Sequence, residues 1–137
     1  MIVAGCDVGS LTAKAVIMDE NGLVASAVAL AKRSPEESAR AVMDLALKDA
    51  GLAMADIARC VGTGYGRKNI SFVNSVESEM ACHARGAVWQ TPSARTVIDI
   101  GGQDCKAIKI DASGAVTRFL YNDKCASGTG RFLEIMA

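Results

Sequence analysis

The sequence has 137 residues, of which 50% are hydrophobic, and it carries 15 basic and 15 acidic residues. This length is typical of one domain, and the apolar share is sufficient to bury a core. A neutral chain with scattered Lys and Arg offers no basic surface for nucleic acid. No apolar run reaches the roughly 20 residues of a membrane span. We therefore expect a globular protein without nucleic-acid or membrane partners.

The N-terminus has no charged leader, and Asp7 interrupts the first apolar run. We therefore expect no signal peptide and a cytoplasmic protein, in which cysteines are free thiols or metal ligands rather than disulfides. The cysteines are odd in number and form no C-x-x-C pair. They are Cys6, Cys60, Cys82, Cys105 and Cys125. Cys6, Cys60 and Cys105 lie in apolar strand patterns, which predicts small core side chains.

The first part of the chain alternates in a way that predicts three strands, a helix, a strand and a second helix. Asn21-Gly22 predicts a tight turn between strands. Ser34 as N-cap, Pro35 in the first turn and Gly51 at the end delimit the first helix. The predicted strands are 2–9, 12–19, 23–32 and 57–63, and the second helix is 75–88. The many alanines of 23–32 leave a helix as the alternative there, but the turn before it favours a strand.

The second part restarts the same pattern. Strands are predicted at 96–100, 104–110 and 115–120, followed by a helix that begins near Arg131. A repeated order of elements predicts a two-lobed α/β fold. We place a linker at Thr91-Pro92-Ser93, a first lobe at 1–92 and an incomplete second lobe at 93–137.

Two loops of the form Asp-x-Gly follow a strand. In the first, glycine lets backbone N–H groups approach phosphate, hydroxyls add donors, and Asp7 can hold a water of Mg²⁺. The alternative is a hairpin whose turn merely needs glycine. The nucleotide-binding residues expected from this loop are Asp7, Gly9, Ser10, Leu11, Thr12 and Lys14.

The second loop reads Asp99-Ile100-Gly101-Gly102-Gln103-Asp104. Its glycine pair can present amides to a terminal phosphate, and we count Gly101, Gly102 and Gln103 among the nucleotide contacts. Asp99 would face Mg²⁺ through water, and Gln103 or Asp104 would position the attacking water. Two such loops suggest two half-sites that close on one nucleotide; a plain turn with polar tips is the alternative.

Three further features stand out. The glycine-rich run 62–67 is either a second phosphate loop or a junction where backbones approach closely. Cys82 and His83 are adjacent on a predicted helix, about 100° apart, so they make a poor ligand pair. Cys125 precedes a helix N-terminus, where an anionic thiolate or a bound iron–sulfur cluster is stabilised, although a surface thiol is the alternative.

The two loops, with Thr63-Gly64-Tyr65-Gly66-Arg67 and the run from Asn122 to Phe132, resemble the activator (ATPase) component of 2-hydroxyacyl-CoA dehydratases. That family includes the benzoyl-CoA reductase ATPase subunits and belongs to the superfamily of acetate and sugar kinases, Hsp70 and actin. The resemblance covers the whole chain. It implies a ribonuclease H-like, actin-like ATPase fold, of which this chain holds the first lobe and the start of the second.

The resemblance further implies a homodimer that shares one [4Fe–4S] cluster, with Cys125 as the first of two cysteines from each subunit. Binding and hydrolysis of ATP, with Mg²⁺, would drive transfer of one low-potential electron to a dehydratase or reductase partner. An electron donor such as ferredoxin or flavodoxin would reduce the cluster. The family's second cysteine and its adenosine loop would lie beyond Ala137.

Two other functions remain open from the residues. One is a small-molecule kinase of the same superfamily, although no sugar-binding constellation is present. The other is a non-catalytic nucleotide-binding assembly module.

Overall fold

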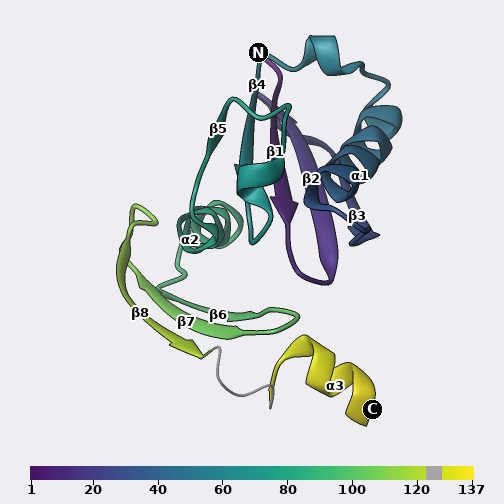
Figure 1. The fold of residues 1–137 in the computed structure, drawn as a ribbon. Helices are drawn as coiled ribbons and strands as arrows, with labels where there is room; N and C mark the ends of the chain where they lie inside the picture. The colour runs from purple at the N-terminus through teal and green to yellow at the C-terminus, as the bar shows by residue number, and fades with distance from the viewer. Residues whose placement is uncertain (123–127) are drawn as a thin grey trace. The chain divides into compact units, whose positions relative to one another are not determined.

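The computed structural model describes residues 1–122 and 128–137. Their contacts divide the chain into two compact units, Met1–Glu77 and Ser78–Ala137. The first unit contains β1 (Val3–Val8), β2 (Thr12–Asp19), β3 (Gly22–Leu30), α1 (Pro35–Ala50), β4 (Arg59–Thr63) and β5 (Ser75–Val76) (Figure 1). The second contains α2 (Glu79–Gln90), β6 (Thr96–Ile100), β7 (Cys105–Ile110), β8 (Val116–Asn122) and α3 (Gly130–Met136).

The first unit is built on a five-stranded sheet in the order β3-β2-β1-β4-β5. β1 pairs antiparallel with β2, so that Asp7 lies opposite Lys14. β1 also pairs parallel with β4, where Asp7 lies opposite Thr63. Because parallel strands end at the same edge of a sheet, the loops after β1 and β4 start side by side.

One face of this sheet packs against α1, which lies along β2 and β3 (Figure 1). Side chains alternate between buried and partly exposed along β1 and β2, as the period of a strand requires. Ser34 accepts a hydrogen bond from the Glu37 amide, and Gly51 ends the helix with φ of 67°. The buried core is Ala4, Cys6, Val8, Ala13, Ala15, Ile17, Ala39, Val42, Met43, Ala46, Leu47, Cys60 and Ile70.

The second unit is a three-stranded antiparallel sheet, β6-β7-β8, with α2 packed against it. Ala84 of α2 is buried with Ile108 and Ile110 of β7. Lys106 lies on the same face as these two isoleucines, opposite Asp99 on β6 and Tyr121 on β8. The register therefore places three polar side chains in one row across the sheet.

The strands and helices predicted from the pattern are confirmed, with one correction. Residues 75–88 do not form a single helix: Ser75 and Val76 pair with β4, and α2 begins at Glu79 with Ser78 as its N-cap. The Glu77 amide continues the pairing by donating to Gly62 O at 2.9 Å. Pairing with a distant strand thus outweighs the local helical pattern.

The boundary between the two compact units lies between Glu77 and Ser78, not at the expected linker around Pro92. The reason is that α2 packs on β6, β7 and β8 and so belongs to the second unit. The assignment of residues 1–92 and 93–137 to two lobes stays a prediction for the intact protein.

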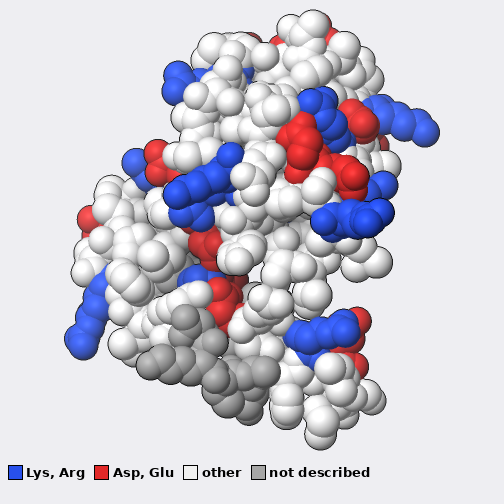
Figure 2. All heavy atoms as spheres, in the orientation of Figure 1, with Lys and Arg blue, Asp and Glu red and all other residues white. Residues whose placement is uncertain are grey.

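The hydropathy of the helices and the distribution of charged side chains can be described for these residues. In the ranges 1–122 and 128–137, none of the helices combines the length and apolarity that a membrane crossing requires. On the face drawn in Figure 2, basic and acidic side chains alternate over the surface rather than gathering by sign.

The core of the first unit can be tested on one helix. Met43 of α1 is 1% exposed, whereas Leu45 is 50% exposed. Met43→Ala should lower the free energy of unfolding by about 2–5 kcal/mol, because it removes buried methylenes and leaves a cavity. Leu45→Ala should cost less than about 1 kcal/mol. Urea unfolding of both variants measures the difference, and equal losses would contradict the packing described.

Candidate functional site

The loop after β1 is a tight turn closed by its own backbone. The Gly9 amide donates to Thr12 O at 3.0 Å. Lys14 Nζ lies 3.3 Å from Asp7 Oδ2, because the two residues are paired across β1 and β2. Ser10 at the tip is exposed, and Leu11 and Thr12 are half-buried. The turn thus holds a carboxylate and an ammonium together beside backbone amides, and nucleotide binding by this loop stays a prediction.

The glycine-rich loop after β4 lies against the end of β1. The Gly66 amide donates to Val8 O at 2.9 Å, and Arg67 Nη1 donates to Gly64 O at 2.9 Å. Gly64 has a φ of 86°, and a Cβ built there would lie 2.6 Å from Val8 O. These glycines are therefore needed for close backbone approach, the second of the two interpretations of residues 62–67.

The loop between β6 and β7 holds the predicted site residue Asp104, and Asp99 lies near the end of β6 just before it. The Gly101 amide donates to Asp104 O at 2.9 Å, which closes the turn. A Cβ at Gly101 would lie 2.6 Å from Asp104 Oδ1, so the carboxylate occupies the space that the missing side chain leaves. Gln103 is exposed at the tip. Asp99 and Asp104 both contact the side chain of Lys106.

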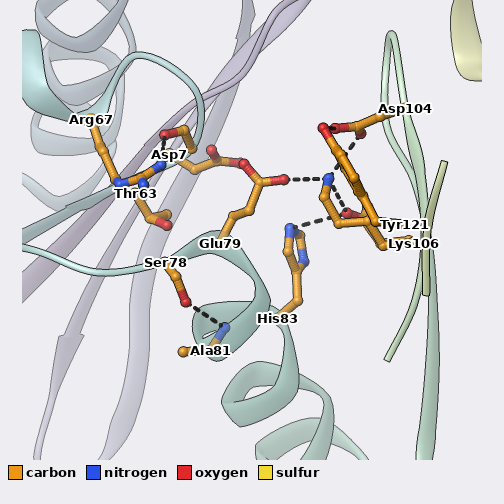
Figure 3. A network of polar contacts seen from close by, with 12 residues as sticks. Asp7, Thr63, Arg67, Ser78, Glu79, Ala81, His83, Asp104, Lys106 and Tyr121 are labelled. Carbon is orange, nitrogen blue, oxygen red and sulfur yellow. Dashed lines mark hydrogen bonds and ion pairs between the residues drawn. The ribbon is translucent and has the colours of Figure 1, made fainter. Parts of the chain in front are cut away.

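Lys106 forms the centre of this site. Its Nζ lies 2.8 Å from Asp104 Oδ1 and 3.4 Å from Asp99 Oδ2, and it pairs directly with Glu79 Oε1 from the first turn of α2. Figure 3 shows Glu79, Asp104, Lys106 and Tyr121 pointing toward one another from the helix and the strands. The Lys106 side chain is only 5% exposed. We call Glu79, Asp99, Asp104 and Lys106 the lysine cluster.

Electrostatics favour the charged form of this lysine. Burial alone would lower the pKa of Lys106, but hydrogen bonds to Asp104 and Glu79 outweigh it, and the pKa lies above its ordinary value. Among the described residues, Glu79, Asp99 and Asp104 are the group whose ligand atoms, within 4.8 Å of one another, could hold a metal ion. In this structure the lysine ammonium is the cation that they surround.

Two side chains support the lysine cluster. The Tyr121 hydroxyl donates to Asp104 Oδ2 at 3.1 Å, and its ring lies 5.3 Å from Lys106 Nζ. His83 Nε2 lies 3.8 Å from Asp99 Oδ2. His83 therefore faces a predicted site residue from α2, a contact between distant segments that its position beside Cys82 does not indicate.

The same glycine loop contacts the start of α3. The Gly130 amide donates to Gly101 O at 2.8 Å, and the Arg131 amide donates to Gly102 O at 3.3 Å. Thr129 is buried and caps the helix by accepting from the Phe132 amide. Cys125, the predicted cluster ligand, lies outside the described residues. The start of α3, which follows Cys125 in the sequence, nevertheless donates hydrogen bonds to the loop between β6 and β7, the second of the two Asp-x-Gly loops.

The four described cysteines are free thiols. Cys6 and Cys60 are each 1% exposed, which confirms both as core side chains, and burial raises the pKa of Cys6 to about 12 and that of Cys60 to about 11. Cys105 differs from its prediction as a core residue, because it is half-buried and its Sγ donates to Gly128 O at 3.2 Å. It lies on the opposite face of β7 from Ile108 and Ile110, which form the core.

The sequence indicates two acids of the lysine cluster but does not single out Glu79 and Lys106 as site residues. A signal for Lys106 is present: it shares the period of Ile108 and Ile110 and so belongs on the buried face of β7. For Glu79 the pattern predicts only an acid at a favourable position near a helix start. Its role depends on packing of α2 against the sheet, which no local pattern encodes.

Glycine at position 64 can be tested against a matched glycine. Gly51 also has positive φ, at 67°, but no atom lies within 4 Å of a Cβ built there. Gly51→Ala should cost about 1–2 kcal/mol of unfolding free energy from backbone conformation alone. Gly64→Ala should cost roughly 1–3 kcal/mol more, because its methyl group overlaps Val8. Denaturant titration of both variants decides, and equal costs would contradict the close approach to β1.

Comparison with known proteins gives the site a context. Residues 4–137 match the model of the BadF/BadG/BcrA/BcrD ATPase family. The activator of lactoyl-CoA dehydratase from Anaerotignum propionicum is 45% identical over 137 residues, which are 100% of this chain and 53% of that protein. A benzoyl-CoA reductase polypeptide from Thauera aromatica is 35% identical over 141 residues, which cover 99% of this chain and 50% of that protein.

A solved structure also resembles the chain. The activator of the 2-hydroxyisocaproyl-CoA dehydratase from Clostridium difficile, with bound ADPNP, aligns with a TM-score of 0.93 and 44% identity. The alignment covers 100% of this chain and 51% of that structure, so the chain spans about half the length of the relatives it matches. The predicted actin-like α/β fold class is confirmed, and the chain belongs to the BadF/BadG/BcrA/BcrD ATPase family.

Proposed function

We propose that the intact protein is an ATP-dependent activator that passes a low-potential electron from a [4Fe–4S] cluster to a 2-hydroxyacyl-CoA dehydratase or a benzoyl-CoA reductase-type partner. The observation that carries this proposal is the likeness of the entire chain to a dehydratase activator with bound ADPNP. Relatives named as activators of lactoyl-CoA and 2-hydroxyisocaproyl-CoA dehydratase support the same class of partner.

The two Asp-x-Gly loops are proposed to hold the nucleotide. Gly101 and Gly102 would offer their backbone amides to the terminal phosphate, and Ser10 and Gln103 are exposed at the tips of the two loops. The loop of the first unit contributes Asp7, Gly9, Leu11, Thr12 and Lys14. Backbone amides and hydroxyls of these residue types bind phosphate oxygens without a P-loop sequence.

Asp7 and Asp99 are proposed to hold Mg²⁺ through water. The chemistry of these donors fits, because Mg²⁺ prefers carboxylate, water and phosphate oxygens and keeps several waters. When bound, the ion would neutralise charge that develops on the transferred phosphate. In the described residues, the contacts of Asp99 all involve Oδ2, which leaves Oδ1 for a metal-bound water. Asp104 remains a candidate to orient the attacking water together with Gln103.

The hydrogen bonds from Gly130 and Arg131 to the glycine pair suggest how nucleotide state reaches the cysteine loop. A change in the loop that holds the terminal phosphate would move Gly101 O and Gly102 O, the acceptors for the first amides of α3. The helix follows Cys125 by a few residues. Loop and helix would therefore shift as one piece, a small displacement of the kind that switches in nucleotide-binding proteins use.

We propose Cys125 as a ligand of the [4Fe–4S] cluster in a cytoplasmic homodimer, with ferredoxin or flavodoxin as electron donor. An iron–sulfur cluster is held by cysteine thiolates, and it supplies a one-electron carrier of low potential when bound. The described thiols Cys6 and Cys60 do not suit this role, because they are buried and protonated. Cys125 is the proposed ligand because it lies in the run from Asn122 to Phe132 that carries the family resemblance.

The role of Asp99 can be tested by hydrolysis. In the intact protein, Asp99→Asn should lower the turnover of ATP at least about 10-fold, because a charged group that holds the metal-bound water is lost. Asp44→Asn is a matched control, since Asp44 is exposed on α1. Phosphate release at saturating Mg·ATP measures both. Unchanged turnover in Asp99→Asn would remove the assigned metal role.

The role of Cys125 can be tested by iron content. Cys125→Ala in the intact protein, purified without oxygen, should lose its iron, its acid-labile sulfide and its visible absorption while it still binds ADP. Cys82→Ala, which removes a half-buried thiol, should keep all three. A cluster that survives Cys125→Ala would exclude this ligand. Absence of iron from the native protein, with ATP bound, would instead favour the kinase or assembly alternatives.

A further inference from the structure

Lys106 has no role in the function proposed so far, although it is the most extensively paired charged side chain described. It contacts one acid from α2, one from β6 and one from the loop before β7. With a side chain 5% exposed, the ammonium is poorly placed to reach a phosphate directly. Its closest route to the reaction is through the three carboxylates that it contacts.

The contacts of these carboxylates are unequal. Both oxygens of Asp104 are engaged, Oδ1 by Lys106 and Oδ2 by the Tyr121 hydroxyl. Asp99 is held differently, because Lys106 and His83 both approach Oδ2. Among the described residues, Asp99 Oδ1 therefore has no protein partner. The lysine cluster fixes one end of this carboxylate and leaves the other available.

The arrangement also solves an electrostatic problem. Three carboxylates whose oxygens lie within 4.8 Å of one another repel, and burial strengthens that repulsion. A metal ion would hold them together, but so does an ammonium at their centre. Lys106 and His83 both lie on the Oδ2 side of Asp99, which leaves Oδ1 as the oxygen that a divalent ion or its bound water would meet.

We propose that Lys106 is a positioning residue for ATP hydrolysis, whose ammonium holds Asp99 by Oδ2 and presents Oδ1 to the metal-bound water. This inference rests on the function proposed for Asp99. Lys106 would orient the carboxylate of Asp99. A displacement of a reacting group by about 1 Å can reduce a rate roughly 100-fold. Tyr121, through Asp104, and His83 restrain the same cluster.

The test compares two lysines of one strand in the intact protein. Lys106→Gln should lower kcat for ATP at least about 10-fold. Lys109→Gln is the matched control, because Lys109 is exposed on the same strand. Lys106→Arg, which keeps the charge, should recover part of the loss. A kcat of Lys106→Gln within about twofold of Lys109→Gln would overturn the proposal.

A binding measurement separates positioning from general support of the fold. The affinity for ADP is measured by calorimetry with and without Mg²⁺. Positioning predicts that Lys106→Gln loses the enhancement by Mg²⁺ while its metal-free affinity stays within about threefold of native. Equal losses with and without Mg²⁺ would show that the lysine merely maintains the unit, which overturns the proposal.

Two further comparisons make the outcome decisive. If Lys106→Gln does not fold, Lys106→Met, which keeps the length of the side chain without its charge, is measured in its place: reduced turnover with native metal-free affinity supports the proposal, and native turnover overturns it. Asp99→Asn is measured beside them. Normal hydrolysis in Asp99→Asn removes the proposed role of Asp99 itself, whereas slow hydrolysis there and native hydrolysis in Lys106→Gln removes only the role of Lys106.

Discussion

The second unit depends on one buried ammonium that is shared by three carboxylates. Lys106 links α2 to β6 and to the loop before β7 through its ion pairs, and to β8 through the ring of Tyr121. Buried charges are costly to desolvate, and removing one member of such a group typically costs about 3–5 kcal/mol. The helix and the sheet are therefore held at a polar centre as well as by the small apolar cluster around Ile108.

The first unit uses different means to shape its loops. Alanines and other small side chains on β1 and β2 let α1 pack closely on the sheet, and glycines let the loop after β4 approach β1. No buried cation is needed there, since Asp7 and Lys14 are paired near the surface. Each unit thus presents an acid beside a glycine turn. In the first unit close packing shapes the loops, and in the second unit the ion pairs of Lys106 hold the acids in place.

Much of this could be predicted because it is local. Ser34, Pro35 and Gly51 delimit α1 by capping chemistry. The alternation of buried and more exposed side chains in β7 follows directly from its sequence. The predicted start of α2 was wrong because Ser75 and Val76 pair with a strand elsewhere in the chain. The sequence predicts Asp99 and Asp104 as site residues but not Glu79 and Lys106. Glu79 reaches Lys106 only through tertiary packing, which a local sequence pattern does not encode.

The protonated thiols of the first sheet have a consequence for reactivity. Cys6 and Cys60 are each 1% exposed, and their raised pKa keeps the nucleophilic thiolate scarce at neutral pH. Alkylating reagents, oxidants and stray transition-metal ions all act on thiolates. These two positions should therefore stay chemically silent in the folded state, so that sulfur chemistry on this protein reports on its other cysteines.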